Sequence, residues 1–158
     1  MFREFPKAAI ANSPTIAGPA TWGGLDADTL KAALYNNNIT PDKDATLANT
    51  AYNAGQWANT EEVSDGTDWD AGGEPVTGGA LTTPSTGVVM FDASDTPQGG
   101  ASTTLASVFG CLVYDDSIAG GSAADQGVTY HYFGGSQSVT AGTFTIVWHA
   151  NGLFRITV

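Results

Sequence analysis

The sequence predicts a mainly β protein: an antiparallel β-sandwich or barrel with at most one short helix and an extended N-terminal arm. Three observations support this. Only 13% of the 158 residues are charged, roughly half of the ~25% typical of globular domains. Thr, Ser, Asn and 20 glycines must therefore build the polar surface, and they favour strands and turns. Short apolar runs of strand length recur from Val76 to the C-terminus.

Residues 1–24 differ from the rest of the chain. Pro6, Pro14 and Pro19 rule out a continuous helix and favour extended backbone. The apolar residues there have no regular period, so the segment needs another surface to lie on, either its own body or a neighbouring subunit. We predict that residues 1–24 form an arm and residues 25–158 a single β-sandwich domain. The arm's candidate partner-binding residues are Phe2, Arg3, Phe5, Lys7, Ile10, Ile16 and Trp22.

The segment after the arm contains two ambiguous stretches. In "TLKAALY", residues 29–35, the alternation of side chains permits a strand, although its alanines also suit a helical turn. A short helix is predicted over residues 45–57, with Asp44 as its N-cap and Gly55 helping to end it.

From Val76 onward the chain is predicted to be β structure. "TGVVMF" (86–91) and "SVFGCLVY" (107–114) have strand length, and the second is apolar on both faces, as in a central strand covered on both sides. In "VTYHYF" (128–133), strict alternation places Val128, Tyr130 and Tyr132 on one face and the other three residues on the opposite face.

The last residues alternate most clearly. A hairpin between residues 143–148 and 153–158 would have either a two-residue loop, pairing Trp148 with Arg155, or a three-residue loop, pairing Trp148 with Phe154. The three-residue loop joins the two apolar sets on one face and puts Gly152 where a left-handed residue is needed. We therefore predict the three-residue loop, with the chain ending inside a sheet.

Charge and composition exclude several classes of protein. The 16 acidic and five basic residues give a net charge of -11, which repels phosphate and argues against nucleic-acid binding. No segment approaches the ~18 apolar residues of a membrane span. The single cysteine, Cys111, lies in an apolar run and is predicted to be a buried small residue.

No catalytic motif is evident. His131 and His149 are expected to be structural, and the acids adjacent in sequence, such as Asp115 and Asp116, would point to opposite faces of a strand. There is no nucleotide-binding or zinc-hydrolase motif. We therefore predict a protein that is not an enzyme and has no cofactor.

The stretch "TDWDAGGEP", residues 67–75, was tested as a calcium loop. Counted from Asp68 as position one, Asp70 and Gly73 fit positions three and six, whereas Gly72 and Gly79 fail at positions five and twelve. We predict a structural loop with Trp69 packed and the acids facing water, and no metal site. A weak, irregular calcium site near Asp68 and Asp70 stays open as an alternative.

Four segments in the same order carry a resemblance to known proteins. They are "DTLKAALY" (28–35), "NTEEVSDGTDWDAGGEPVTG" (59–78), "VFGCLVYDD" (108–116) and "YFGGSQSVTAGTFTIVWHANGLFRIT" (132–157). Together, over residues 26–158, they resemble small virion proteins of tailed bacteriophages. Trp69 and the glycines at 72 and 73 match the pattern of that group, but Asp68 replaces its usual glycine, which weakens any inherited metal role.

The resemblance implies a structural virion protein, most simply a capsid decoration or minor capsid protein outside the head, made in the host cytoplasm. Its expected partners are the major capsid protein or other virion subunits, contacted through the arm, and copies of itself, with a trimer favoured. The alternative is a carbohydrate-binding β-sandwich of a tail or fibre. That alternative would use exposed Trp57 and Trp69 and a calcium ion near Asp68 and Asp70.

Overall fold

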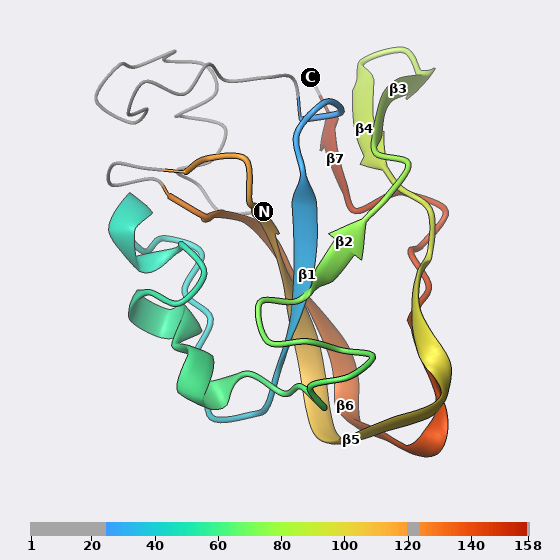
Figure 1. Ribbon diagram of the computed structural model, residues 1–158. Coiled ribbons are helices and arrows are strands. Elements are labelled where there is room, and N and C mark those ends of the chain that lie inside the picture. The colour runs from blue at the N-terminus through green and yellow to red at the C-terminus, as the bar shows by residue number, and fades with distance from the viewer. Residues whose placement is uncertain (1–24, 120–123, 158) are drawn as a thin grey trace.

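The computed structural model describes residues 25–119 and 124–157, and in them it shows two antiparallel β-sheets (Figure 1). Sheet A has the strand order β2-β1-β5-β6, and sheet B has the order β3-β4-β7. The predicted mainly β, sandwich-like fold is confirmed. The strands are β1 (Leu30–Tyr35), β2 (Glu74–Val76), β3 (Ala80–Ser85), β4 (Val88–Asp92), β5 (Thr96–Asp115), β6 (Gln126–Ile146) and β7 (Phe154–Thr157).

The helical content of the described residues is three short 3-10 turns, η1 (Leu47–Asn49), η2 (Gly55–Trp57) and η3 (Asn59–Glu61). Within this part of the chain, no helix is long and apolar enough to span a membrane. The segment 29–35, left open between helix and strand, forms strand β1, which pairs with both β2 and β5.

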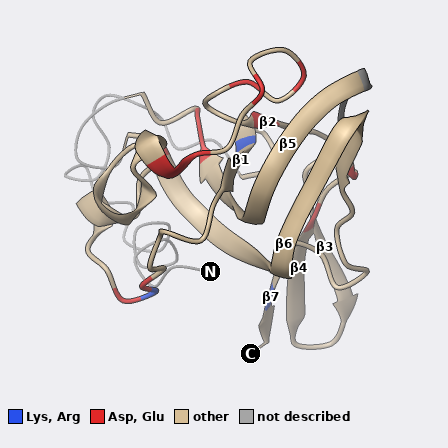
Figure 2. Ribbon diagram, turned by 90° about the horizontal axis from the view of Figure 1, so that it is seen from below, with Lys and Arg blue, Asp and Glu red and all other residues tan. Residues whose placement is uncertain are grey.

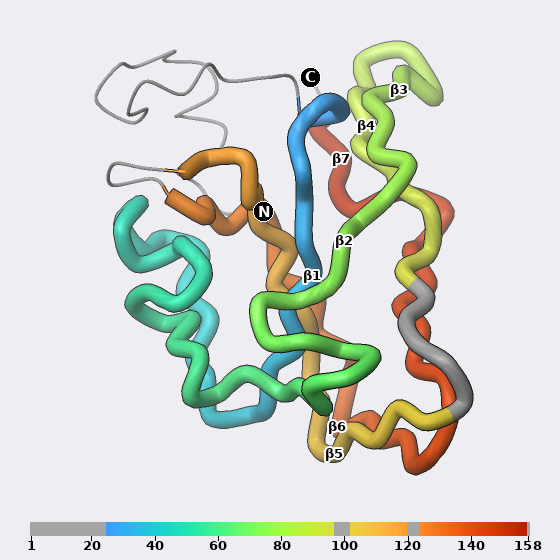
Figure 3. Tube along the Cα trace, in the orientation of Figure 1, coloured from blue at the N-terminus to red at the C-terminus, as the bar shows by residue number. Residues whose placement is uncertain are grey.

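Strands β5 and β6 form one long ribbon that links the two sheets. They have 20 and 21 residues and pair from Asp115↔Gln126 to Thr96↔Ile146. Halfway along, the pairing jumps from Gly110↔Tyr132 to Val108↔Gln137, so β6 holds three residues more than β5 does across this step. Extra residues on one strand bend a ribbon. The ribbon accordingly doubles back, and its second half continues into β4 and β7 of sheet B (Figures 1 and 3).

The main hydrophobic core lies on the face of sheet A that is enclosed by the bent ribbon and sheet B. Sheet A contributes alternate residues of β1 and several residues of β5, sheet B contributes Phe91, and the loop before β2 contributes Trp69. Its fully or almost fully buried members include Leu34, Trp69, Phe91, Val108, Cys111, Val113 and Val128.

A second core covers the opposite face of sheet A. Tyr35, Leu112 and Tyr114 from the sheet pack there against Trp57, and the Tyr35 hydroxyl donates to the Trp57 carbonyl at 2.8 Å. The 3-10 turns lie on this side of sheet A, away from sheet B (Figure 1). The prediction of a doubly covered central strand is therefore confirmed for "SVFGCLVY", because β5 faces both cores.

The predicted helix over residues 45–57 is wrong. Only two short stretches of it form 3-10 turns, and Thr46, not Asp44, precedes the first of them and makes no side-chain capping bond. The chain adopts left-handed backbone at Asn53 (φ 54°), between the two turns, and at Gly55 (φ 52°), where the second one begins, and this interrupts a right-handed helix. This turn buries Trp57 in the second core.

Two details of the β predictions are also wrong. Val128 lies on the main-core side whereas Tyr130 faces the second core, because a register shift between Val113 and Tyr114 breaks the alternation there. The predicted C-terminal hairpin does not form, since β7 pairs with β4, through Phe91↔Phe154 and Val89↔Ile156, rather than with β6.

The turn expected in that hairpin nevertheless exists. Gly152 has a φ of 73°, and its N–H donates to the His149 carbonyl at 2.7 Å. The chain then crosses to sheet B, where the N–H of Leu153 donates to the Phe91 carbonyl at 2.9 Å. The turn chemistry was predicted correctly and the strand partner was not, and the last described residues do form a strand within a sheet.

Candidate functional site

The predicted partner-binding residues lie outside the described residues, because all of them belong to the arm. They are Phe2, Arg3, Phe5, Lys7, Ile10, Ile16 and Trp22. Three features of the described residues are candidates for a functional site: the acidic glycine loop, the carboxyl groups of Asp28 and Asp115, and the β3–β4 hairpin. Acidic residues gather mainly in loops and turns (Figure 2).

Asp65 organises the acidic loop. Its Oδ1 accepts the backbone N–H groups of Thr67, Asp68 and Trp69 at 3.0, 2.9 and 2.9 Å, and its Oδ2 accepts that of Thr104 at 3.2 Å. These donors, led by Trp69, hold the pKa of Asp65 well below its usual range. The carboxylate therefore serves the fold, closing a turn and tying it to β5.

Trp69 anchors the loop in the main core, as the sequence predicted. Its side chain is 1% exposed and meets the ring of Phe144 edge-on, with centroids 5.6 Å apart. Its neighbour Asp68 accepts the Thr103 hydroxyl at 3.1 Å, whereas Asp70 is exposed. The loop is thus pinned to both strands of the bent ribbon.

The two glycines of the loop sit in a network of hydroxyl and carboxyl groups. Glu62 accepts the Gly72 N–H at 2.8 Å and the Tyr52 hydroxyl at 2.7 Å, and the Tyr114 hydroxyl donates to the Gly72 carbonyl at 2.5 Å. Burial raises the pKa of Glu62, an effect that these donors oppose. Gly73 lies directly against the backbone of β1. These groups hold the loop rather than a ligand.

The geometry gives no support to the calcium alternative. Over residues 25–119 and 124–157, no three His, Cys, Asp or Glu side chains are grouped so that they could hold a metal ion. Asp68 is engaged by Thr103 and Asp70 faces solvent.

A pair of carboxyl groups, Asp115, which is buried, and Asp28, which is half-buried, lies near the start of the described chain. Asp115 is 0% exposed, and its Oδ1 accepts the Ser117 N–H at 2.9 Å, while Oδ2 meets no donor. The side chain of Asp28 is its hydrogen-bond partner. Burial, followed by the charge of Asp28, raises the pKa of Asp115 to about 7. Two carboxyls can hydrogen-bond to each other only when one is protonated, and the raised pKa of Asp115 favours its protonated form.

Backbone and ionic contacts fasten the same part of the chain. The Thr29 N–H donates to the Ser117 hydroxyl at 2.6 Å, and the Asp116 N–H donates to the Thr29 carbonyl at 2.9 Å. Lys31 pairs with Asp116 at 3.0 Å. Sequence reasoning missed this cluster, although an aspartate that ends an apolar strand, as Asp115 does, is a signal that could have found it.

The histidines and the cysteine have structural settings. His131 meets the ring of Trp148 edge-on at 5.3 Å, and burial lowers its pKa to about 4, so the ring is neutral at pH 7. His149 Nδ1 accepts the Asn151 N–H at 3.1 Å. Cys111 is fully buried, which raises the pKa of its thiol, and this confirms it as a small core residue.

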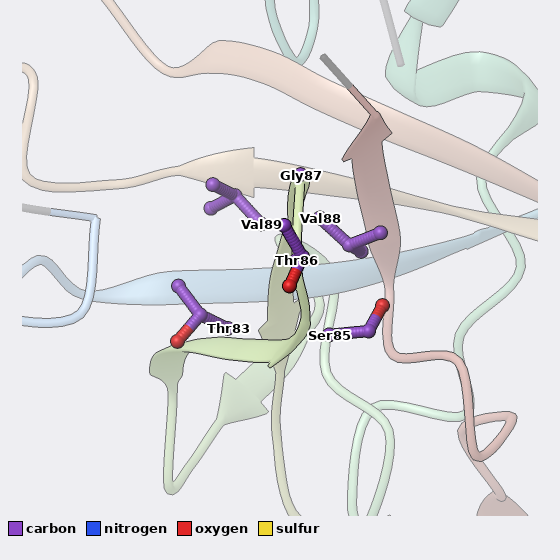
Figure 4. Close-up of a pocket in the computed structure, with 6 residues that line it drawn as sticks. All are labelled: Thr83, Ser85, Thr86, Gly87, Val88 and Val89. Atoms are coloured by element: carbon purple, nitrogen blue, oxygen red, sulfur yellow. The ribbon is translucent and has the colours of Figure 1, made fainter.

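A hollow of about 470 Å³ lies at the β3–β4 hairpin (Figure 4). Thr83 and Val89 project from one side of the hairpin and Ser85 and Val88 from the other (Figure 4). No lining residue carries a titratable group, so the hollow offers no acid or base for catalysis. It is lined by Thr83, Ser85, Thr86, Gly87, Val88 and Val89.

Trp57 and Trp69, the residues expected to be exposed in the carbohydrate alternative, are 0% and 1% exposed. That expectation is wrong because each ring fills the centre of one of the two cores. Neither ring offers a face on which a sugar could stack.

No family model, curated protein or solved structure matches this chain. The resemblance to phage virion proteins therefore stays a prediction, and the function is argued from the charges and contacts of the chain itself.

Removing the carboxylate of Asp65 is expected to loosen the acidic loop. The variant Asp65→Ala leaves three N–H groups of one turn without their acceptor, which should lower the free energy of unfolding by about 1–2 kcal/mol, as for a lost helix N-cap. Urea denaturation at pH 7 measures the loss. Asp70→Ala, at an exposed position of the same loop, is the control, and equal losses in both variants would contradict this role for Asp65.

Proposed function

We propose that this chain is a non-enzymatic structural protein of a bacteriophage virion, a capsid decoration or minor capsid protein bound to the outside of the head through its N-terminal arm. The observation that carries the proposal is the division of charge. Residues 25–158 hold 15 acidic and three basic side chains, a formal charge of −12, whereas residues 1–24 hold one acidic and two basic, a charge of +1.

This division of charge favours an exterior position. A body of charge −12 is repelled by packaged nucleic acid, so the arm, with its charge of +1, is the part of the chain suited to attachment. The arm combines Arg3 and Lys7 with aromatic and aliphatic residues, the side-chain types that contribute most to protein interfaces. The proposed partners are the major capsid protein or other virion subunits, and a trimer is the favoured self-association.

The body supports the same role. The carboxylates of Asp65 and Glu62 accept hydrogen bonds from backbone and tyrosine groups, and Asp115 is locked in its carboxyl pair. These acids are engaged with other groups of the body, so none of the three is free to act on a substrate.

Deleting residues 2–22 is expected to abolish binding to phage heads that lack the protein, because the deletion removes all the proposed anchors. Co-sedimentation of purified protein with such heads measures the binding, and circular dichroism checks that the body stays folded. Undiminished binding by the folded deletion variant would rule out the arm as the attachment segment.

Charge alone is tested with two matched double variants. One double variant, Arg3→Ala with Lys7→Ala, removes two positive charges from the arm. The other, Lys43→Ala with Arg155→Ala, removes two positive charges from exposed sites of the body. The arm pair should weaken binding at low ionic strength and the body pair should not.

A further inference from the structure

One face of sheet B carries apolar side chains beyond the core. Phe91 is fully buried and stacks on Phe154, its partner in register, at 5.6 Å. Leu81 pairs with Phe91, and the pair Val89↔Ile156 lies two residues along the strands, so all of these side chains share one face. Leu81, Val89 and Ile156 are nevertheless 48%, 37% and 36% exposed. We name Leu81, Thr83, Val89 and Ile156 the open end of sheet B.

The arm joins the body beside this open end. The side chain of Leu25 packs against the main core, and its carbonyl oxygen lies 4.0 Å from the point where a Cβ on Gly79 would stand. Gly79 precedes Leu81 by two residues. In Figure 1 the loop that begins the described chain lies at the same end of the molecule as the β3–β4 hairpin.

The arm itself divides into two halves. Residues 13–24, next to the body, contain no charged side chain, whereas residues 1–12 contain Arg3, Glu4 and Lys7. An apolar surface is covered without penalty only by a segment that buries no charge. The near half satisfies this condition and provides Ile16 and Trp22 as apolar side chains. Trp22 is three residues from Leu25, so its Cα stays within about 11 Å of that residue.

We infer that residues 13–24 pack Ile16 and Trp22 onto the open end of sheet B of the same chain. These two residues then act within the chain, and contact with the partner falls to the five other predicted binding residues, all within residues 1–12. Only the role of residues 1–12 rests on the proposed function. Docking of the near half fixes the place from which the far half leaves the body. Because fewer residues then lose conformational freedom on attachment, binding to the shell is strengthened.

Crosslinking between cysteines tests this inference on the isolated full-length protein. Thr21→Cys, beside Trp22, is combined with Thr83→Cys on the open end, or with Thr82→Cys on the opposite face of the same strand. Thr82 and Thr83 are both exposed, and the native Cys111 is buried and unreactive. With a short bis-maleimide, the Thr83 variant should give a several-fold higher yield of intramolecular crosslink than the Thr82 variant.

Two outcomes would overturn the inference. Equal intramolecular yields would show that the arm does not select this face. Covalent dimers formed through Thr83→Cys would assign the face to the arm of a second copy. A further deletion, of residues 2–12, separates the inference from the proposed function: it should abolish binding to phage heads and leave the crosslink unchanged. Binding to phage heads can therefore be lost while residues 13–24 stay docked on sheet B, and docking can be absent while binding to phage heads persists.

Discussion

Gly73→Ala is expected to destabilise the protein far more than Gly66→Ala, although both glycines lie in the same acidic loop. Their φ angles are alike, 75° and 73°, so alanine meets the same left-handed backbone penalty at each position. Their surroundings differ. A Cβ on Gly73 would collide with the Ala32 carbonyl and come within 2.6 Å of the Ala33 nitrogen, whereas a Cβ on Gly66 would meet nothing within 4 Å.

The collision at Gly73 cannot be relieved by rotating a side chain, because the obstructing atoms belong to the backbone of β1 in the middle of sheet A. Gly66→Ala should therefore lower the free energy of unfolding by only the ~1–2 kcal/mol of left-handed backbone strain. Gly73→Ala adds the displacement of β1 from β2 and should exceed ~4 kcal/mol, the range of exceptional single substitutions.

Urea denaturation of both variants, followed by tryptophan fluorescence, measures the difference. If Gly73→Ala is too unstable to fold at all, it should lack a near-ultraviolet circular dichroism signal that Gly66→Ala retains, which also shows the larger loss of stability at Gly73. Similar stabilities for the two variants would show that the loop does not rest on β1 as described.

The stability of the protein should fall as the pH rises from about 4 to 7, and Asp115→Asn should remove much of this fall. Burial raises the pKa of Asp115 to about 7 from an ordinary value of 3.8. Between these values the folded chain binds a proton that the unfolded chain has released. The stabilisation is complete below the lower pKa and is lost as the pH passes through the higher one.

Asparagine at position 115 can keep the hydrogen bonds of the aspartate but has no titratable group. Its Oδ1 can still accept the Ser117 N–H, and its amide can donate to Asp28 in place of the carboxyl proton. We expect Asp115→Asn to exceed the parent chain at pH 8 by on the order of 2 kcal/mol and to differ little from it at pH 4. The other charged groups of this cluster are Asp26, Lys31, Asp116 and Asp125.

Thermal denaturation at intervals between pH 4 and 8 provides the measurement, with Asp116→Asn as the neighbouring control. Asp116→Asn loses an ion pair with Lys31 but leaves the carboxyl pair intact, so the fall with pH should persist. A parent chain and an Asp115→Asn variant with parallel pH profiles would contradict proton binding by Asp115 in the folded chain. Asp65 has the opposite effect on stability, because its pKa is lowered in the folded state. Its carboxylate stabilises the folded chain throughout this pH window, and that stabilisation is lost only as the pH falls below it.

The predictability of the fold from sequence depended on whether a signal was local. The apolar run around Cys111 predicted a central strand correctly, because a strand covered on both sides needs apolar residues at every position. The C-terminal hairpin failed because alternation and Gly152 specify a turn but not which strand lies alongside. The step at which the ribbon bends has left-handed backbone at Ser107, a residue type that gives no sign of it, and at Gly134, one of two adjacent glycines that sequence reasoning did not use.

The residues of the candidate site were likewise predictable only where the signal was local in the sequence. The packing of Trp69 was predicted from a loop pattern within a few residues of it. The burial of Trp57 was missed because the predicted helix was wrong, and the bond of Asp115 with Asp28 joins residues far apart in sequence. The arm residues were selected from charge and proline content, and their role stays a prediction because they lie outside the described residues.

The bent ribbon has a consequence for the order of folding. β5 and β6 meet across the short connection of residues 116–125, so their first pairs form with little loss of chain entropy. Pairing can then extend from Asp115↔Gln126 to Thr96↔Ile146, and it brings β4 and β7 together only after the bend has formed. The pairing of β4 with β7 is therefore a late step, whereas the β3–β4 hairpin of sheet B, which closes from Ser85 to Val88, can form by itself.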